Sequence, residues 1–181
     1  GVLPRSDRAA QALVATEDSR FWSDPGVDPL SVVRAGLATA VGSNDVGGAS
    51  LEQQLAKNLW FGGRRDRVAQ AEEVVVALKL DRTWTKDQVL RMYLGQVYFG
   101  HGYYGLDEAA HGYFGLAPSQ LSWAQASMLA GLVQAPSAYD PVTHLAAGKQ
   151  RQRHVLDRLV STGVLTASAA DAAYAAPLHL R

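Results

Sequence analysis

The sequence contains no cysteine, no excess of either charge and no long hydrophobic run. Without cysteine the chain can form neither disulfides, thiolate nucleophiles nor cysteine-ligated metal sites, and this absence leaves the cellular compartment open. The 17 basic and 17 acidic residues cancel, which excludes a nucleic-acid-binding protein held by bulk charge. No stretch of about 18 apolar residues occurs, so the chain as given has no segment that spans a bilayer.

The length and the hydrophobic content are those of a globular domain. A chain of 181 residues with 48% hydrophobic content is long enough for one well-packed domain, with room for two lobes. Because the sequence starts without a methionine, we expect residues 1–181 to be one domain of a longer protein. Apolar residues recur with a helical period and few segments alternate with a period of two, which predicts an all-α fold.

The helical pattern divides the chain into several predicted elements. A helix through residues 9–14 leads into Glu17 and Asp18, and Asp28 followed by Pro29 begins the next one. Residues 41–50 form a glycine-rich connection. Serine or threonine followed three residues later by glutamine, at Ser50 and Thr85, predicts capping boxes. The further predicted helices cover residues 51–61, 68–84 and 86–97, a short helix between two loops within 98–115, and residues 121–133, 146–161 and 167–176.

Polar side chains on the helix 51–61 form the first candidate binding site. Gln54, Lys57 and Asn58 are spaced i, i+3 and i+4, so they share one face of an α-helix. Such a face can bind sugar hydroxyls or phosphate oxygens. The alternative is an ordinary solvated helix face, because amide and charged residues mostly lie outside.

Two pairs of neighbouring carboxylates form the second candidate. Glu17 and Asp18 end an apolar helix and are either a solvated helix end or a site of proton chemistry. Glu72 and Glu73 lie in an otherwise apolar helix, so one of them points nearer the interior. A carboxylate drawn inward has a raised pKa unless a cation faces it, and a raised pKa suits a general acid or base. The alternative is that Glu72 and Glu73 are an exposed pair with no role in chemistry.

The histidines give no sign of a metal site. The five histidines show no HExxH spacing, and His101 and His111 are expected to be loop residues rather than metal ligands.

Taken in order, several motifs resemble one known family. The motifs are "ED..F....G.D", "GGASLEQQLAKN", a glutamate in a long helix, and "TKDQVLRMYLGQVYFGHGYYG". Together they resemble the peptidoglycan glycosyltransferase domain, glycosyltransferase family 51, of class A penicillin-binding proteins and monofunctional glycosyltransferases. The resemblance continues through "AAHGYFG" and "LSWAQASMLAGLVQAPSAYDP" to "RQRHVLDRLVSTGVLT" and so covers nearly the whole chain. It implies a mainly helical, lysozyme-like fold, with a large lobe and a smaller jaw lobe around an extended cleft and an apolar surface that dips into the membrane.

The resemblance also implies an activity and a set of site residues. Family members polymerise lipid II into β-1,4-linked glycan by inverting transfer, with undecaprenyl pyrophosphate as leaving group. By the family pattern Glu17 is the base for the acceptor hydroxyl and Asp18 supports it, while Glu73 acts at the phosphate end. Lys57 matches a position on the donor side, and the leaving diphosphate needs cations or a metal ion. The candidate cofactor is therefore Mg²⁺ or Mn²⁺, and no organic cofactor is expected. The remaining substrate-binding candidates are Phe21, Ser50, Gln53, Gln54, Asn58, Lys86, Tyr93 and Tyr98.

Some positions depart from the family pattern. Ala69 and Gln70 stand where the third motif normally has an Arg-Lys pair, and neutral side chains stabilise a diphosphate poorly. We hypothesise that Arg67, one helical turn before Gln70, or Arg64 or Arg65, which precede the helix, supplies the missing charge. Other departures are Asp24 for a histidine, Ala49 and Ser50 for a Ser-Thr pair, Glu52 for a threonine, and Arg91 and Gly95 for a glutamate and an asparagine.

Three functions remain open from the sequence. The first is an atypical but active lipid II polymerase, the second a non-catalytic or very slow homologue that binds lipid II or glycan, and the third a muramidase-like lytic enzyme. The expected location is the outer face of the bacterial cytoplasmic membrane, with an N-terminal anchoring helix absent from this chain. The expected partners are lipid II, the growing glycan strand, the membrane surface and a fused or separate transpeptidase domain, and no nucleic acid.

Overall fold

The computed structural model describes residues 7–23, 50–61 and 67–181, apart from the side chains of residues 61, 67–71 and 74. The predicted helix after Pro29, the connection 41–49, Asp24, Arg64 and Arg65 lie outside the described residues. The chain divides into two compact units, Gly1–Thr16 with Tyr93–Arg181, and Glu17–Met92. A larger and a smaller unit agree with the two lobes expected from the resemblance, and the expected cleft stays a prediction.

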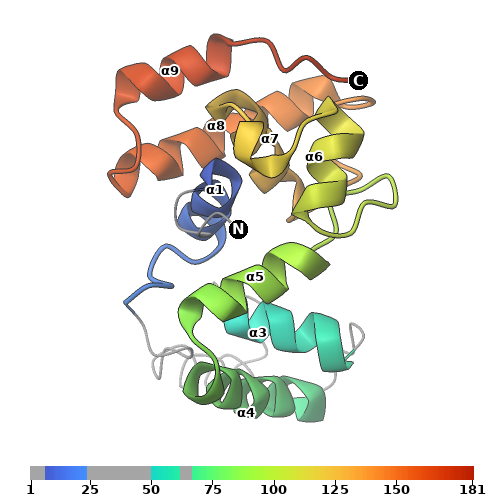
Figure 1. Cartoon of the computed structure of the whole chain (residues 1–181), viewed down its shortest axis with the longest axis vertical. Coiled ribbons are helices and arrows are strands. Elements are labelled where there is room, and N and C mark those ends of the chain that lie inside the picture. Colours follow the sequence, from blue (N-terminus) through green and yellow to red (C-terminus); the bar gives the residue numbers. More distant parts are fainter. Residues whose placement is uncertain (1–6, 24–49, 62–66) are drawn as a thin grey trace. The chain divides into compact units, whose positions relative to one another are not determined.

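The elements are helices throughout the described part of the chain, as predicted (Figure 1). The only β-type pairing in these residues is an isolated bridge between Tyr98 and Tyr104. In chain order the elements are α1 (Arg8–Glu17), α3 (Leu51–Ala56), the π-helix η2 (Lys57–Phe61), α4 (Arg67–Thr83), α5 (Lys86–Gln96), α6 (Leu106–Phe114), the 3₁₀-helix η3 (Pro118–Gln120), α7 (Trp123–Leu132), α8 (Leu145–Ser161) and α9 (Ala167–Ala175).

The smaller unit is built on α3 and α4, which pack against each other (Figure 1). Both predicted capping boxes are present. The Ser50 hydroxyl accepts the Gln53 amide at 3.2 Å, and Gln53 Oε1 accepts the Ser50 amide at 2.9 Å, which begins α3. Thr85 and Gln88 make the same reciprocal pair at 2.9 and 3.3 Å at the start of α5. These local pairs satisfy amides that the first helical turn leaves without intrahelical partners.

The predicted helix 51–61 does not stay α-helical along its length. It is an α-helix only to Ala56, and residues from Lys57 onward form a π-helix. The prediction that Asn58 shares a helix face with Gln54 assumed α-helical spacing, and it does not hold because Asn58 lies in the π-helix. Short π-helical turns of this kind are often found at functional sites.

The larger unit surrounds α7, which is buried from Ala124 to Leu132 and packs on α8, α9 and α6. Helix α1 also belongs here until Thr16, and its inner residues Ala9, Ala12 and Leu13 have no exposed surface. Two arginines add polar contacts at its ends. Arg8 donates to the carbonyl of Leu121 at 2.8 Å, and Arg158 donates to the carbonyl of Ala15 at 3.2 Å. The helix that leads to Glu17 is therefore fixed in a packed core up to its last turn.

The expected loop position of His111 is wrong, because His111 lies within α6 and its Nδ1 is 2.9 Å from the Asp107 carbonyl. His101 does lie in a loop, with Nε2 2.9 Å from Asp140 Oδ2. Within the part of the chain that the structure describes, no helix has the length and apolar character needed to cross a membrane.

Candidate active site

Glu17 is the last residue of α1 and is half-buried. Its Oε2 accepts a long hydrogen bond of 3.4 Å from Nε2 of Gln54 on α3. Glu17 of the first motif and Gln54 of the second are 37 residues apart in the sequence, and this contact brings them together within the smaller unit. Part of the surface of Glu17 therefore remains open to solvent.

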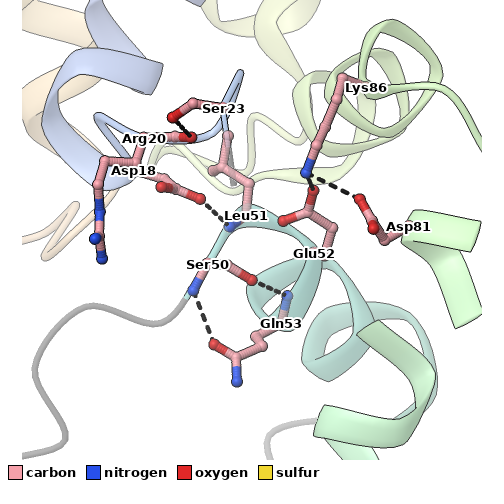
Figure 2. A network of polar contacts seen from close by, with 9 residues as sticks. All are labelled: Asp18, Arg20, Ser23, Ser50, Leu51, Glu52, Gln53, Asp81 and Lys86. Carbon is pink, nitrogen blue, oxygen red and sulfur yellow. Dashed lines mark hydrogen bonds and ion pairs between the residues drawn. The ribbon is translucent and has the colours of Figure 1, made fainter. Parts of the chain in front are cut away.

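Asp18 points to a different place from Glu17. Its Oδ2 accepts the Leu51 amide at 3.1 Å, directly at the start of α3 (Figure 2). A carboxylate at this end of a helix is favoured by the helix dipole and by the amides that lack intrahelical partners. Asp18 therefore ties the turn after α1 to the start of α3, while its neighbour Glu17 contacts a side chain of the same helix.

A buried ion-pair network lies on the other side of α3. Lys86 Nζ is 2.6 Å from Glu52 Oε1 and 3.1 Å from Asp81 Oδ1 (Figure 2). The same ammonium lies 4.9 Å from the ring centroid of Phe21, a cation–π distance. We call Glu52, Asp81, Lys86 and Phe21 the Lys86 cluster. It joins the turn after α1, the helix α3, the end of α4 and the start of α5.

Burial is unequal across this cluster. The side chain of Glu52 is 1% exposed and that of Lys86 is 20% exposed. Burial raises the pKa of Glu52, and the hydrogen bond and charge of Lys86 only partly offset it. Burial also lowers the pKa of Lys86, but the hydrogen bonds and charges of Glu52 and Asp81 outweigh it, so the pKa is raised. Glu52 therefore bears most of the desolvation cost, and its Oε2 is buried without a hydrogen-bond partner.

Glu73 is the more buried member of the second glutamate pair, as predicted, since Glu72 is exposed. Burial raises the pKa of Glu73, and the charge of Lys57 acts in the opposite direction. The α4 glutamate and the η2 lysine thus interact electrostatically, and α4 contacts η2. Lys57 and Glu73, which the resemblance assigns to the donor side and the phosphate end, therefore lie on contacting elements of the smaller unit.

Replacing Lys57 with methionine is expected to raise the pKa of Glu73 further, because the ammonium that lowers it is removed while burial remains. Carbon-detected nuclear magnetic resonance of the Glu73 carboxyl measures this directly. The matched control is Lys79→Met, a surface lysine on the same helix as Glu73, which should leave the Glu73 titration in place. A Glu73 titration midpoint that does not rise in Lys57→Met contradicts the interaction.

The other predicted site residues have varied surroundings. Phe21 has no exposed surface, and Asn58 is exposed. Arg67 begins α4, but its side chain lies outside the described residues. Tyr93 is 1% exposed and Tyr98 is 39% exposed, and both belong to the larger unit. Their binding roles, like those of the residues above, stay predictions.

Sequence reasoning treated Glu52 only as a departure from the family pattern and missed Asp81. One signal was available for Glu52. Glu52, Leu55 and Ala56 have i, i+3 and i+4 spacing, which puts a carboxylate on the buried face of α3. A buried carboxylate needs a cation, but no sequence rule identifies one 34 residues away.

Among the described residues no group of three or more histidine, cysteine, aspartate or glutamate side chains could hold a metal ion. Mg²⁺ and Mn²⁺ take oxygen ligands and are often held by one or two carboxylates together with substrate phosphates. Glu73 fits that second arrangement as a single carboxylate whose pKa is influenced by the charge of Lys57. The divalent cofactor stays a proposal.

Comparison with known proteins supports the resemblance drawn from the motifs. A family model described as Transglycosylase matches residues 4–160. A Cupriavidus necator protein whose name assigns it to the transglycosylases is 36% identical over 181 residues, which are 100% of this chain and 78% of that protein. Penicillin-binding protein 1A of Aquifex aeolicus is 37% identical over 97% of this chain and 24% of its own length. Penicillin-binding protein 1F of Bacillus subtilis is 36% identical over 98% of this chain and 25% of its own length.

The chain therefore spans about a quarter of the length of the two penicillin-binding proteins. A crystal structure of penicillin-binding protein 1A from Haemophilus influenzae aligns with a TM-score of 0.48 at 22% identity, over 72% of this chain and 16% of that chain.

Proposed function

From the premise that the chain belongs to the transglycosylase family, glycosyltransferase family 51, whose function is glycosyl transfer in peptidoglycan synthesis, we propose that it polymerises lipid II. The product is a β-1,4-linked glycan strand and the leaving group is undecaprenyl pyrophosphate. The observation that carries the proposal is the contact between Glu17 and Gln54, because it unites the family's first two motifs around a carboxylate.

Glu17 serves as the general base in this proposal. The acceptor sugar hydroxyl is a poor nucleophile, so a carboxylate must take its proton as the oxygen attacks the anomeric carbon of the donor. Gln54 donates to one oxygen of Glu17 and so orients the carboxylate for this proton transfer. Asp18 supports this geometry indirectly by holding α3 against the turn that comes after α1.

Lys57 and Glu73 serve at the diphosphate end. The ammonium of Lys57 compensates negative charge as the carbon–oxygen bond to the diphosphate breaks. Glu73 lies on α4, which contacts η2, and the charge of Lys57 lowers the pKa that burial of Glu73 raises. A divalent cation, when bound, would supply further positive charge to the diphosphate, and Glu73 is the described carboxylate that would hold it. Arg67 remains the proposed substitute for the cations missing at Ala69 and Gln70.

Exposed apolar side chains of the smaller unit support a membrane surface as partner. Leu59 and Trp60 of η2 are 38% and 57% exposed, and Val75 and Leu78 of α4 are 51% and 38% exposed. Since η2 and α4 contact each other, these side chains lie on neighbouring elements. Large exposed apolar residues of this kind mark surfaces that bind membranes or other proteins. Such a surface would suit a lipid-linked substrate, and it supports our proposal that the protein works at the outer face of the cytoplasmic membrane, with a fused or separate transpeptidase domain as partner.

The second candidate function is a non-catalytic homologue that binds lipid II or glycan. The loss of the third-motif cations at Ala69 and Gln70 favours it, because fewer charges remain to stabilise the leaving diphosphate.

One experiment decides among the functions. The protein is incubated with radiolabelled lipid II in detergent micelles, and separately with purified sacculi. We expect glycan strands that lysozyme digests. Lipid II binding without polymer would instead establish the non-catalytic homologue, and shortened sacculus strands would establish a lytic enzyme.

A further inference from the structure

Glu52 is, among the described residues, the most deeply buried charged side chain that the proposed mechanism leaves unused. It is buried on the inner face of α3, together with Leu51, Leu55 and Ala56. Burying a carboxylate is costly unless a cation and hydrogen bonds compensate it, and its Oε2 has no hydrogen-bond partner. A hydrophobic residue of similar volume would fill this place at lower cost. The position of Glu52 therefore calls for a role beyond stability.

Lys86 is where several segments of the smaller unit meet. It reaches Glu52 of α3 at 2.6 Å and Asp81 of α4 at 3.1 Å. Its ammonium also lies against the ring of Phe21, which comes four residues after Glu17. Because both carboxylates already engage it, the positive charge of Lys86 is neutralised inside the cluster. Its position fits a link between segments better than a contact with a diphosphate.

The turn after α1 is attached toward α3 through contacts of two of its residues. At one point Asp18 accepts the Leu51 amide at 3.1 Å, and at the other the buried Phe21 ring packs under Lys86. The turn is also closed internally, because the Phe21 amide donates to the Asp18 carbonyl at 3.0 Å. Both points of attachment lead to α3, through residues 51 and 52. The same helix carries Gln54, the partner of Glu17.

We propose that Glu52 is a positioning residue for the glycosyl transfer. By holding Lys86 against Phe21, it fixes the turn 18–23 on α3 and so keeps Glu17 aligned with Gln54. This inference rests on the proposed function, since it assigns Glu17 the role of base. Correct alignment of a reacting group matters because a misplacement of about 1 Å can cost about 100-fold in rate.

The test separates alignment from stability. Glu52→Leu removes the carboxylate but fills the site with an apolar side chain, so the free energy of unfolding is expected to stay equal or rise. We expect kcat for lipid II polymerisation to fall about tenfold while KM changes less than about twofold, because alignment acts on the chemical step. Glu52→Gln, which retains an oxygen that can accept from Lys86, should recover part of the loss. Asp81→Asn is the matched control, and it should keep kcat within about twofold since the link from Lys86 to Glu52 remains.

A second measurement does not depend on activity. Amide hydrogen exchange of Phe21 and Ser23, whose amides donate within the turn, should be several-fold faster in Glu52→Leu than in Asp81→Asn or the unaltered protein. Wild-type kcat in Glu52→Leu, or unchanged exchange in the turn, overturns the positioning role. If the unaltered protein makes no polymer, the proposed function fails, and the exchange measurement alone decides whether Glu52 holds the turn.

Discussion

Glu17→Gln is expected to lower the rate of lipid II polymerisation by a factor of about 10²–10⁴, the usual contribution of a general base. The amide has the shape of the carboxylate, and its oxygen can still accept from Gln54 at the observed position. It cannot take the proton of the acceptor hydroxyl. The loss should therefore appear in kcat, with the affinity for lipid II and the free energy of unfolding nearly unchanged.

The measurement is initial-rate polymerisation of labelled lipid II, with binding followed separately by fluorescence anisotropy. Glu108→Gln is the matched control, because Glu108 is an exposed glutamate on α6 in the other unit. It should polymerise at the unaltered rate. Full activity of Glu17→Gln would remove Glu17 from the chemistry, whatever the other variants do.

Lys86→Met is expected to have the largest effect on stability, a loss of about 3–5 kcal/mol in the free energy of unfolding at pH 7. Glu52 would then be a buried carboxylate without the cation that it contacts at 2.6 Å. Removing the charge of Glu52 instead of that of Lys86 is expected to cost less stability. In Glu52→Gln, Lys86 keeps Asp81 at 3.1 Å and is 20% exposed, so we expect a change of only about 1 kcal/mol. Urea denaturation followed by circular dichroism measures both.

The stability lost in Lys86→Met is expected to depend on pH. Burial raises the pKa of Glu52 in the folded protein above its ordinary value of 4.5. The folded protein therefore binds this proton more tightly than the unfolded chain does, and the contribution of Glu52 to the free energy of unfolding falls as the pH rises above 4.5. Without Lys86 the folded-state pKa rises further. The deficit of Lys86→Met should therefore be smallest below pH 4.5, where Glu52 becomes protonated in both states, and grow toward neutral pH. A deficit that is equal at acid and neutral pH would show that lost packing, not the buried charge, destabilises the variant.

The features that could be predicted from the sequence were mostly local. The capping boxes at Ser50 and Thr85 depend on residues three apart, and both are present. Helical periodicity likewise predicted α4, α7, α8 and α9, because each buries an apolar face or core that the sequence shows directly. The prediction that one glutamate of the α4 pair lies nearer the interior followed from the same pattern.

The unpredicted features depend on contacts between distant segments. Asp18 could be recognised as a carboxylate of the first motif, but its amide partner lies 33 residues away on α3. The pairing of Glu52 with Lys86 spans 34 residues and depends on the first residue of α5 reaching a side chain of α3. The change from α- to π-helix at Lys57 has no counterpart in the apolar spacing, so periodicity extended the α-helix too far.

The π-helix also decides which side chains of its segment meet solvent. Glu52, Leu55 and Leu59 are spaced i, i+3 and i+7, and in an uninterrupted α-helix Leu59 would join the buried face. The wider turn holds an additional residue, which rotates the later residues by about 100° relative to the α-helical register. Leu59 is 38% exposed as a result, next to Trp60 at 57%. Apolar exposure at this end of the segment thus accompanies the change of backbone register at Lys57.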